Sequence, residues 1–328
     1  MNYKESKLIL EEIIKAKRIL LSCHRSPDPD SIASNLSMYQ VLIKLKKDVK
    51  VFSPDKIHTN FKFLPFVDKI QTVNYSNFDY SGFDLFIALD ASSFDQVSGI
   101  KKIKLPNVPI IIIDHHFTNE KFGFINLLNI VSSTCEILLG VFKDWKIEID
   151  KDLATCLLTG IYADSVSFQT DNSKASTFEV SLELIKLGAD REKIILNLYN
   201  SNEFILIKFW GELLKNIVID NEHKFVWTAV PYEIFSKYGK PGEAKSLAAN
   251  LIFRSIKGTD FGIVMVEQRP KVLNMSYRSR TQFDVSKIAK KLGGSGHKAS
   301  AGGWFEFENF DEAVNKVLQV ARKFAKKG

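Results

Sequence analysis

The amino-acid sequence predicts an α/β protein, with an N-terminal doubly wound parallel sheet followed by a smaller C-terminal α+β domain. In the first half, short apolar segments rich in β-branched residues alternate with segments of helical spacing, which is typical of a parallel sheet with crossover helices. In the second half, expected strands follow one another around a hairpin turn. The length of 328 residues suits two domains better than one.

Four segments of the first half are expected to form strands of the parallel sheet. Each is short and apolar and is bounded by polar or turn-forming residues. They are 18–23, 49–53, 84–89 and 108–113. Segments of helical spacing lie at 31–47, 132–142, 152–162 and 176–187. The apolar run 108–113, bounded by Pro109 and by the polar turn after it, is typical of a strand buried on both faces.

In the second half the sequence pattern changes from alternating strands and helices to consecutive strands, which predicts a separate domain. Strands are expected at 224–230, 261–268 and 272–278, with a hairpin around Pro270, and helices at 242–251, 285–291 and 310–325. Residues 191–217 have a helical pattern and carry no recognisable chemistry. We therefore expect a first domain at 1–190, a helical linker at 191–217 and a second domain at 218–328.

Composition excludes several classes of protein. No stretch approaches eighteen apolar residues without a charge, so no membrane span is expected. The N-terminus lacks the continuous apolar segment of a secretory signal, which favours a cytoplasmic location. Cys23, Cys135 and Cys156 lie far apart in apolar segments, so we expect buried thiols rather than disulfides or a zinc knuckle. The net charge of +7 is compatible with a phosphate-rich partner and equally with lysines that solvate helix faces.

Ionisable side chains stand at the ends of the expected strands of the first half. Three of them directly follow the strand 108–113, and the others follow segments ending at 23, 89 and 163. In an open parallel sheet the carboxyl ends of the strands share one edge, where ligands bind. We therefore expect these side chains to converge there. They are His24, Asp28, Asp30, Asp90, Asp114, His115, His116 and Asp164.

The chemistry of this set favours metal binding. Carboxylates outnumber imidazoles and no thiolate stands among them, which favours Mn²⁺ or Mg²⁺ over a structural zinc ion. The set exceeds the needs of one ion and suits two ions with a bridging carboxylate, an arrangement that activates water in phosphoryl transfer. Taken singly, each residue has a plainer interpretation. An aspartate after a strand often caps a helix, and Asp30 could cap the 31–47 helix.

The second domain contains a stretch of small residues at 293–303. Backbone N–H groups in such a stretch can approach an anion closely, although a glycine-rich segment is also often a plain turn. Cationic side chains within it and on the strand before it, including Lys298 and Arg280, favour the anion-binding interpretation, because arginine pairs bidentately with phosphate. The candidate binding residues are Arg278, Gly294, Gly296 and His297.

Together these motifs resemble the four motifs of the DHH phosphoesterase superfamily. The pattern His24-x-x-x-Asp28-x-Asp30, then Asp90, then 114–116, then Asp164, has the order and spacing of that superfamily. The 293–303 stretch resembles the signature of its DHHA1 substrate-binding domain. The resemblance covers nearly the whole chain. In length and domain pairing the chain is most similar to the NrnA-like members, which degrade very short oligonucleotides and dephosphorylate 3′-phosphoadenosine 5′-phosphate (pAp).

The resemblance implies two divalent ions, Mn²⁺ more than Mg²⁺, and a role for each site residue. One ion would be held by His24, Asp28 and Asp90, and the other by Asp30, Asp90, His115 and Asp164. His116 would contact the scissile phosphate, and Asp114 would orient the pair of histidines. Arg278 and His297 would hold the far end of a short RNA or DNA oligonucleotide or of a nucleotide. The resemblance is also compatible with a homodimer.

Three alternatives remain open at this point. The substrate could be a cyclic dinucleotide or its linear product pApA, or long single-stranded DNA as in RecJ-like exonucleases. The chain could instead be a non-catalytic nucleotide sensor, which predicts that a ligand has been lost, and none is lost. Pro29 and Ser295 depart from the glycines usual in the family, which puts fine substrate preference in doubt rather than hydrolysis.

Overall fold

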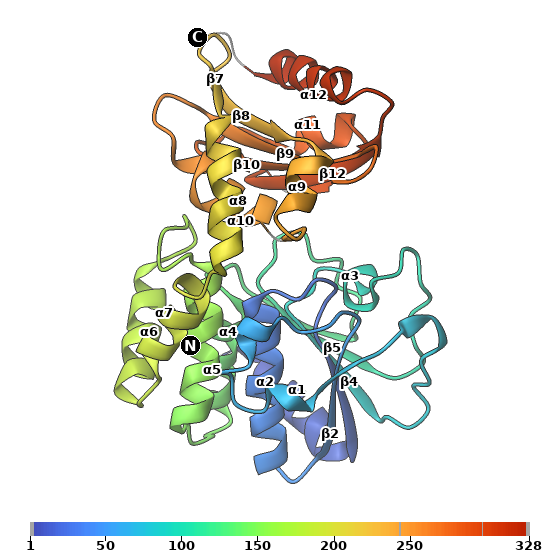
Figure 1. Cartoon of the computed structure of the whole chain (residues 1–328). Helices are drawn as coiled ribbons and strands as arrows, with labels where there is room; N and C mark the ends of the chain where they lie inside the picture. The colour runs from blue at the N-terminus through green and yellow to red at the C-terminus, as the bar shows by residue number, and fades with distance from the viewer. Residues whose placement is uncertain (1–2, 243, 297, 326–328) are drawn as a thin grey trace. The chain divides into compact units, whose positions relative to one another are not determined.

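The chain folds into two compact units, 1–201 and 202–328, in the computed structural model (Figure 1). The structure describes residues 3–242, 244–296 and 298–325. The division falls within the segment 191–217, for which a helical linker is expected. Of the two helices in this segment, α7 (Arg191–Tyr199) belongs to the first unit and α8 (Phe204–Lys215) to the second.

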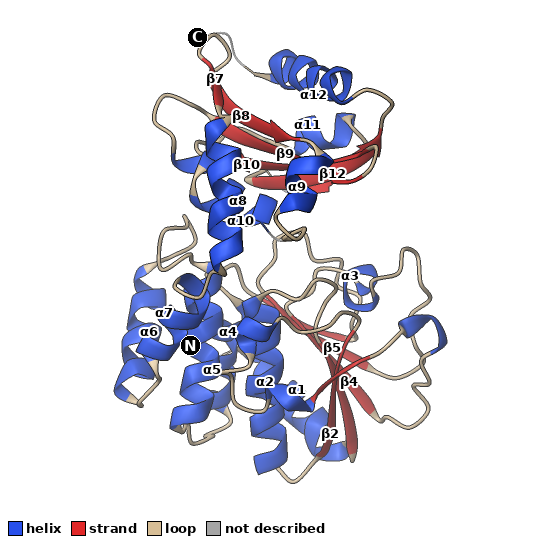
Figure 2. Ribbon diagram, in the orientation of Figure 1, coloured by secondary structure: helices blue, strands red, loops and turns tan. Residues whose placement is uncertain are grey.

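The first unit contains a sheet of six parallel strands, which confirms the predicted fold class (Figure 2). In the strand order β3-β2-β1-β4-β5-β6, successive strands are added toward one edge from β1 to β3 and toward the other edge from β4 to β6. In open α/β sheets, ligands bind at the switch point between two such halves, which here lies between β1 and β4. The strands are β1 (Arg18–Ser22), β2 (Asp48–Ser53), β3 (Ile70–Thr72), β4 (Leu85–Leu89), β5 (Ile110–Asp114) and β6 (Ile125–Leu128). The short edge strands β3 and β6 are not predicted from the sequence.

Both faces of this sheet are covered, which explains the continuous apolar runs of its strands. Ile19 and Leu21 of β1 pack into the core formed with the larger helices, whereas Leu20 packs into the opposite core with Phe94 of α3. Figure 2 shows α2, α4 and α5 grouped beside the strands. The helices of this unit, besides α7, are α1 (Lys4–Lys15), α2 (Pro29–Lys44), α3 (Phe94–Ser98), α4 (Thr134–Asp144), α5 (Lys151–Asp164) and α6 (Ala175–Lys186).

Helix α5 corrects one expectation. Asp164 is the last residue of α5 and does not follow a strand. Residues 153–162 are all buried, so the helix is apolar on every side and its C-terminal turn has no amphipathic spacing. The predicted helix at 152–162 is confirmed, and the error concerns only the segment ending at 163, since a short apolar segment cannot be told from a buried strand by its periodicity alone.

The second unit contains a mixed six-stranded sheet in the order β11-β12-β10-β9-β8-β7, flanked by helices on both faces. Strands β8 and β9 are parallel and the other pairs are antiparallel, including the predicted hairpin of β9 and β10. The strands are β7 (Val218–Asp220), β8 (Phe225–Val230), β9 (Phe261–Arg269), β10 (Val272–Ser279), β11 (Ser295–Gly296) and β12 (Ser300–Glu306). Besides α8, the helices are α9 (Tyr232–Lys237), α10 (Ala244–Leu251), α11 (Ser286–Lys291) and α12 (Phe310–Phe324).

Alternate residues of β9 define the two faces of this sheet. Ile263 and Met265 pack with α11 and α12, whereas Val264 and Val266 pack with α8, α9 and α10. The strands β7, β11 and β12 and the helix α9 are not predicted from the sequence. Part of the 293–303 stretch, expected to be a loop, pairs as β11 and β12.

Two predictions from composition can be compared with the structure. The three cysteines are free and buried, as predicted. Among the residues that the structure describes, no helix is long and apolar enough to cross a bilayer.

The buried Glu136 joins α4 to α6, and we predict that Glu136→Ala lowers the free energy of unfolding by about 2–3 kcal/mol. Its carboxylate, 1% exposed, accepts hydrogen bonds from Ser132 (N at 3.2 Å and Oγ at 2.6 Å), from Ser176 Oγ at 2.9 Å and from Thr177 Oγ1 at 2.9 Å. The alanine variant leaves these buried donors unpaired. Equilibrium urea unfolding measures the loss.

The matched control is Glu183→Ala, which removes an exposed ion pair with Lys143 between the same two helices. Its expected cost is below about 1 kcal/mol, because solvent screens exposed pairs. Equal losses in the two variants would contradict the structural role given to Glu136.

Candidate metal centre

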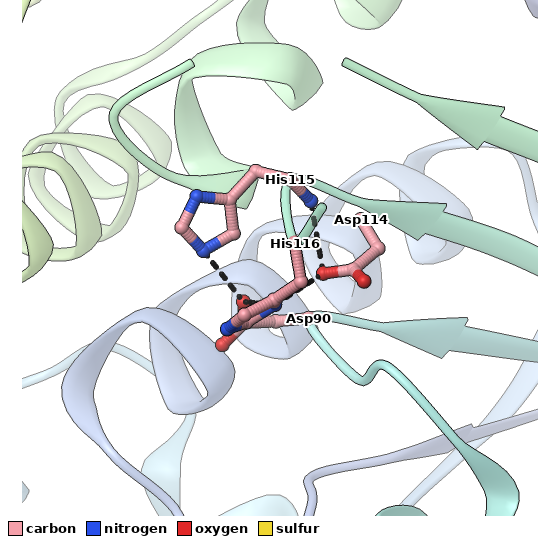
Figure 3. Close-up of side chains that lie close together, drawn as sticks. All are labelled: Asp90, Asp114, His115 and His116. Carbon is pink, nitrogen blue, oxygen red and sulfur yellow. Dashed lines mark hydrogen bonds and ion pairs between the residues drawn. The ribbon is translucent and has the colours of Figure 1, made fainter. Parts of the chain in front are cut away.

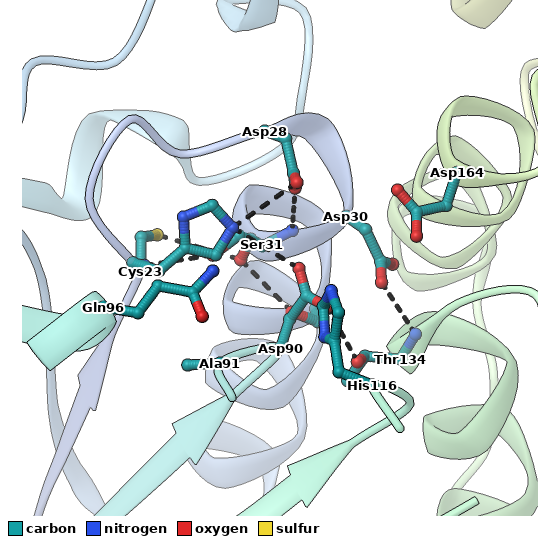
Figure 4. A network of polar contacts seen from close by, with 12 residues as sticks. Cys23, Asp28, Asp30, Ser31, Asp90, Ala91, Gln96, His116, Thr134 and Asp164 are labelled. Carbon is teal, nitrogen blue, oxygen red and sulfur yellow. Dashed lines mark hydrogen bonds and ion pairs between the residues drawn. The ribbon is translucent and has the colours of Figure 1, made fainter. Parts of the chain in front are cut away.

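The predicted site residues of the first unit lie together at the carboxyl edge of its sheet (Figure 4). His24 follows β1, Asp90 follows β4, and His115 and His116 follow β5. The switch point of the sheet lies between β1 and β4, so His24 and Asp90 flank it. The remaining carboxylates come from helix ends, since Asp28 and Asp30 lie at the start of α2 and Asp164 at the end of α5.

The first group of ligand atoms is formed by His24, Asp28 and Asp90. His24 Nε2 lies 3.4 Å from Asp28 Oδ2 and 3.7 Å from Asp90 Oδ2. The other ring nitrogen, Nδ1, lies 2.8 Å from the carbonyl oxygen of Arg25. A carbonyl only accepts hydrogen bonds, so Nδ1 carries the proton and Nε2 faces the carboxylates with its lone pair when the ring is neutral.

The second group is formed by Asp30, His115 and Asp164. His115 Nε2 lies 3.1 Å from Asp164 Oδ2 and 3.4 Å from Asp90 Oδ1. Its Nδ1 lies 3.2 Å from the carbonyl oxygen of Val131, which again leaves Nε2 for the carboxylates. In each group the ligand atoms lie within 4.8 Å of one another.

Asp90 lies between the two groups. Its Oδ1 faces His115 and its Oδ2 faces His24, so the two oxygens of one carboxylate point to different histidines (Figure 3 shows the His115 contact). Its backbone is left-handed, with φ of 56°, a conformation that costs energy in any residue other than glycine. The bond from its N–H to Ile113 O (3.1 Å) and the bond from Thr134 Oγ1 to its Oδ1 (3.1 Å) hold it there.

Asp114 orients His116 from a fully buried position. Its Oδ1 lies 2.7 Å from His116 Nδ1 and accepts the backbone N–H of His115 at 2.9 Å (Figure 3). Its Oδ2 accepts the side-chain amide of Asn119 at 2.6 Å, and Asn119 also donates to Ala91 O at 3.0 Å. The sequence analysis misses Asn119, which carries no signal beyond its proximity to the motif.

Asp30 is held by a helix other than its own. Its two oxygens accept the N–H groups of Thr134 at 2.7 Å and Cys135 at 3.2 Å, at the start of α4. The alternative that Asp30 caps its own helix is therefore wrong, because Asp28 is the N-cap of α2. Gly160 of α5 makes room for this contact, since a Cβ there would lie 2.2 Å from Asp30 Oδ1. The sequence analysis misses Thr134 and Gly160.

The pKa shifts of the cluster show that negative charge from its carboxylates exceeds the positive charge available to balance it. Burial and the neighbouring Asp90 and Asp164 carboxylates raise the pKa of Asp30 well above its ordinary value. Burial also raises the pKa of Asp164. Burial lowers the pKa of His24, but the Asp28 and Asp90 charges outweigh it and raise that pKa to about 10. Protons thus supply the charge that these crowded carboxylates require.

The donor set fits divalent cations. Asp90 Oδ2 and His115 Nε2 are buried and have no hydrogen-bond partner within the described residues. Buried polar atoms rarely remain without a partner, and each of these two is a common metal ligand. A dication can replace the protons of the cluster and satisfy both atoms.

The candidate residues of the second unit have packing roles of their own. A Cβ at Gly294 would lie 2.3 Å from Gly302 O, and one at Gly296 would lie 2.4 Å from Ala301 Cα, so close packing against β12 already requires both glycines. Arg278 donates to the side chain of Asn250 and to backbone carbonyls. His297 lies outside the described residues. The part of these residues in substrate binding stays a prediction.

Comparison with known proteins identifies the family. Residues 18–161 match the model of the DHH family, N-terminal domain, and residues 227–323 match the DHHA1 domain. The chain belongs to the DHH/DHHA1 phosphoesterase family. With the cluster of metal-ligand side chains, membership makes it a metal-dependent phosphoesterase of the DHH type.

Relatives of this family match the chain over almost its whole length. It is 25% identical over 327 residues to the bifunctional oligoribonuclease and PAP phosphatase NrnA of Thermus thermophilus, which covers 98% of this chain and 95% of that protein. It is 24% identical over 331 residues to the cyclic-di-AMP phosphodiesterase PdeA of Listeria monocytogenes, covering 96% of this chain and 49% of that protein. These two relatives are almost equally distant and are named for different substrates.

A solved structure has the same fold. An exopolyphosphatase-related protein from Bacteroides fragilis superposes with a TM-score of 0.88 at 24% identity, covering 97% of this chain and 95% of that one. This likeness supports the arrangement of strands and helices described above.

If Asp90 holds two ions, Asp90→Asn should remove both. We expect the affinity for Mn²⁺ to fall by more than the roughly 10–100-fold that loss of a supporting group costs, because a shared ligand charge is lost. Isothermal titration calorimetry measures the affinity and the stoichiometry. The control is Asp95→Asn on α3, whose carboxylate accepts the N–H of Lys102 outside the cluster. Unchanged stoichiometry in the Asp90 variant would contradict the shared position.

Proposed function

We propose that this chain hydrolyses the phosphate ester bonds of oligonucleotides of two to five nucleotides, of pAp, or of both. The observation that carries the chemistry is the position of Asp90, whose two oxygens face His24 and His115 in separate donor groups. The substrate class rests on the match to the T. thermophilus NrnA, which extends over both units of the chain.

Two divalent ions, Mn²⁺ in preference to Mg²⁺, are proposed to bind here. The preference for Mn²⁺ rests on the family resemblance, since a relative that is 27% identical over 180 residues is named a probable manganese-dependent inorganic pyrophosphatase. Bound ions would supply charge stabilisation to the phosphate oxygens and lower the pKa of water. The proposed ligands are His24, Asp28 and Asp90 for one ion, and Asp30, His115 and Asp164 for the other. Asp90 is proposed to hold the second ion as well, through the oxygen that lies 3.4 Å from His115 Nε2.

His116 is proposed to bind the scissile phosphate. Burial lowers its pKa, but the hydrogen bond to Asp114 and the charge of Asp90 outweigh that effect, so the pKa is raised. With Nδ1 bonded to Asp114, Nε2 is the nitrogen that can donate to a phosphate oxygen. Water attacks phosphorus, the ester P–O bond breaks, and the leaving oxygen takes a proton. The cation at His116 stabilises the charge that develops on the phosphate during this step.

The second candidate is the hydrolysis of cyclic di-AMP or of its linear product pApA. The match to the L. monocytogenes PdeA favours it, since this match also extends over both units. A non-catalytic sensor is disfavoured, because all the proposed ligands are present and gathered at one sheet edge.

A panel of substrates tests the proposal. The purified chain with Mn²⁺ is incubated separately with pAp, pApA, RNA of two to five nucleotides, cyclic di-AMP, pyrophosphate and long single-stranded DNA. We expect the highest kcat/KM on the short RNAs or pAp, and no turnover in EDTA. Highest kcat/KM on cyclic di-AMP would establish the second candidate instead, and nucleotide binding without hydrolysis would indicate a sensor.

Replacement of His116 by alanine should lower kcat by about 10²–10³-fold, the range typical for loss of one group that stabilises charge in the transition state. Calorimetry should show unchanged binding of Mn²⁺, because His116 is not a proposed ligand. His58→Ala is the matched control in the same unit, since His58 caps a short 3₁₀ turn outside the cluster. Loss of Mn²⁺ binding in the His116 variant would show that the residue is a ligand after all.

A further inference from the structure

The α5 turn, which is the segment 165–170 directly after helix α5, has a strained backbone. Val166, Ser167 and Phe168 have positive φ angles of 48°, 54° and 68°. This left-handed conformation is unfavourable for any residue with a side chain, and it is an outlier for a β-branched residue such as Val166. A run of three such residues persists only where the contacts around it fix it in place.

The α5 turn caps the carboxyl end of the helix. The last carbonyl groups of an α-helix have no partner within the helix, and left-handed residues after it commonly supply one. The N–H of Val166 donates to Ala163 O at 3.1 Å. The N–H of Ser167 donates to Tyr162 O at 2.8 Å. Asp164 lies in the last turn of the helix, which these bonds close, so relaxation of the α5 turn would let that last turn fray.

The position of the Asp164 carboxylate depends on this helix end. Its Oδ2 lies 3.1 Å from His115 Nε2, and no backbone N–H or hydroxyl group of the described residues donates to it. By contrast, Asp30 accepts two N–H groups of α4, and Asp90 accepts the hydroxyl of Thr134. Figure 4 shows Asp164 at the end of its helix. This carboxylate is therefore placed by the backbone that carries it.

The side chain of Phe168 anchors the α5 turn to two helices. Its ring packs edge-on against Tyr162 of α5, with centroids 5.3 Å apart and an interplanar angle of 83°. It also stacks on Phe178 of α6, with centroids 4.5 Å apart and an angle of 22°. Aromatic pairs of both geometries stabilise beyond the apolar area that they bury. The third left-handed residue is thus tied to packed helices on two sides.

We propose that Phe168 is a positioning residue for Asp164. Its ring holds 166–168 in the left-handed conformation, these residues cap α5, and the capped last turn keeps the Asp164 carboxylate beside His115. Without the ring, the strained run would relax and uncap the helix. The inference rests on the proposed role of Asp164 as a ligand of the second ion, and it extends the residues that determine metal binding to the α5 turn.

The crystal structure of the metal-free Phe168→Ala chain tests the geometry. We expect residues 166–168 to leave the left-handed region, because the strain is no longer offset by the ring. Asp164 Oδ2 should move beyond hydrogen-bond distance of His115 Nε2. If the α5 turn and the contact between Asp164 and His115 are unchanged in this variant, the proposal is overturned.

Calorimetric titration with Mn²⁺ tests the consequence for metal binding. Phe168→Ala should weaken the ion assigned to His115 and Asp164 by roughly 10–100-fold, the range typical for loss of a supporting group, and leave the ion assigned to His24 unchanged. Phe168→Tyr should retain both ions, because a tyrosine ring can stack in the same way. If Phe168 acts through Asp164, the double variant Phe168→Ala/Asp164→Asn should bind Mn²⁺ no more weakly than Asp164→Asn alone. An equal further loss in the double variant would contradict the proposal.

The matched control is Phe83→Ala. Phe83 is also half-buried and stacked on a phenylalanine, Phe78, with centroids 6.2 Å apart and an angle of 20°. It precedes β4 and so lies at the edge of the sheet opposite the metal centre. This variant should leave Mn²⁺ binding unchanged, and a loss equal to that of Phe168→Ala would show general destabilisation instead of positioning. Circular dichroism and Tm show whether each variant is folded, and Phe168→Leu, which cannot stack, replaces an alanine variant that does not fold.

The Asp164→Asn variant separates this inference from the proposed function. If it binds Mn²⁺ as the unaltered chain does, the proposed ligand role of Asp164 is wrong, while the crystal structure of the Phe168→Ala chain still decides the positioning. If Asp164→Asn weakens Mn²⁺ binding and Phe168→Ala does not, the positioning role is refuted and the proposed function stands.

Discussion

Mutual repulsion among buried carboxylates is the constraint on which the centre of the first unit depends. Asp30, Asp90 and Asp164 come from three different elements and lie around the same imidazole, His115. Like charges this close cannot all remain ionised unless cations accompany them. The protein supplies part of the compensation through imidazoles and part through backbone N–H groups. The negative charge that remains uncompensated attracts divalent ions, so this edge of the sheet can bind metal.

The fold provides the compensation that does not depend on metal. The start of α4 directs two N–H groups at Asp30, where the helix dipole also favours negative charge. Backbone carbonyls at Arg25 and Val131 fix the tautomers of the two histidines that face the cluster. The contacts from α4 to Asp30 join segments distant in sequence, whereas Arg25 directly follows His24. The arrangement of the donors is therefore built into the fold of the first unit.

The structural features that depend on a local sequence pattern are predicted correctly. Strands β1, β4 and β5 are apolar runs with ionisable residues at their ends, and both the strands and the convergence of those residues are predicted correctly. The short strands β3 and β6 and the glycine-rich β12 are missed, because sheet pairing rather than propensity stabilises them. Asp164 is wrongly assigned to a strand end, since α5 is apolar on every side. The supporting roles of Thr134, Asn119 and Gly160 depend on tertiary contacts and have no local signal.

The absence of one methyl group at Gly160 has a consequence for the neighbouring ligand. A side chain there would overlap Asp30 Oδ1 and also lie 2.4 Å from Cys135 Sγ, so α5 would have to retreat from α2 and α4. Asp164 lies four residues further along α5, on the same side of the helix as Gly160. A retreat of the helix would carry this carboxylate with it. The distance between the carboxylates of Asp30 and Asp164 thus depends on how closely the bare backbone at Gly160 lets α5 approach its neighbours.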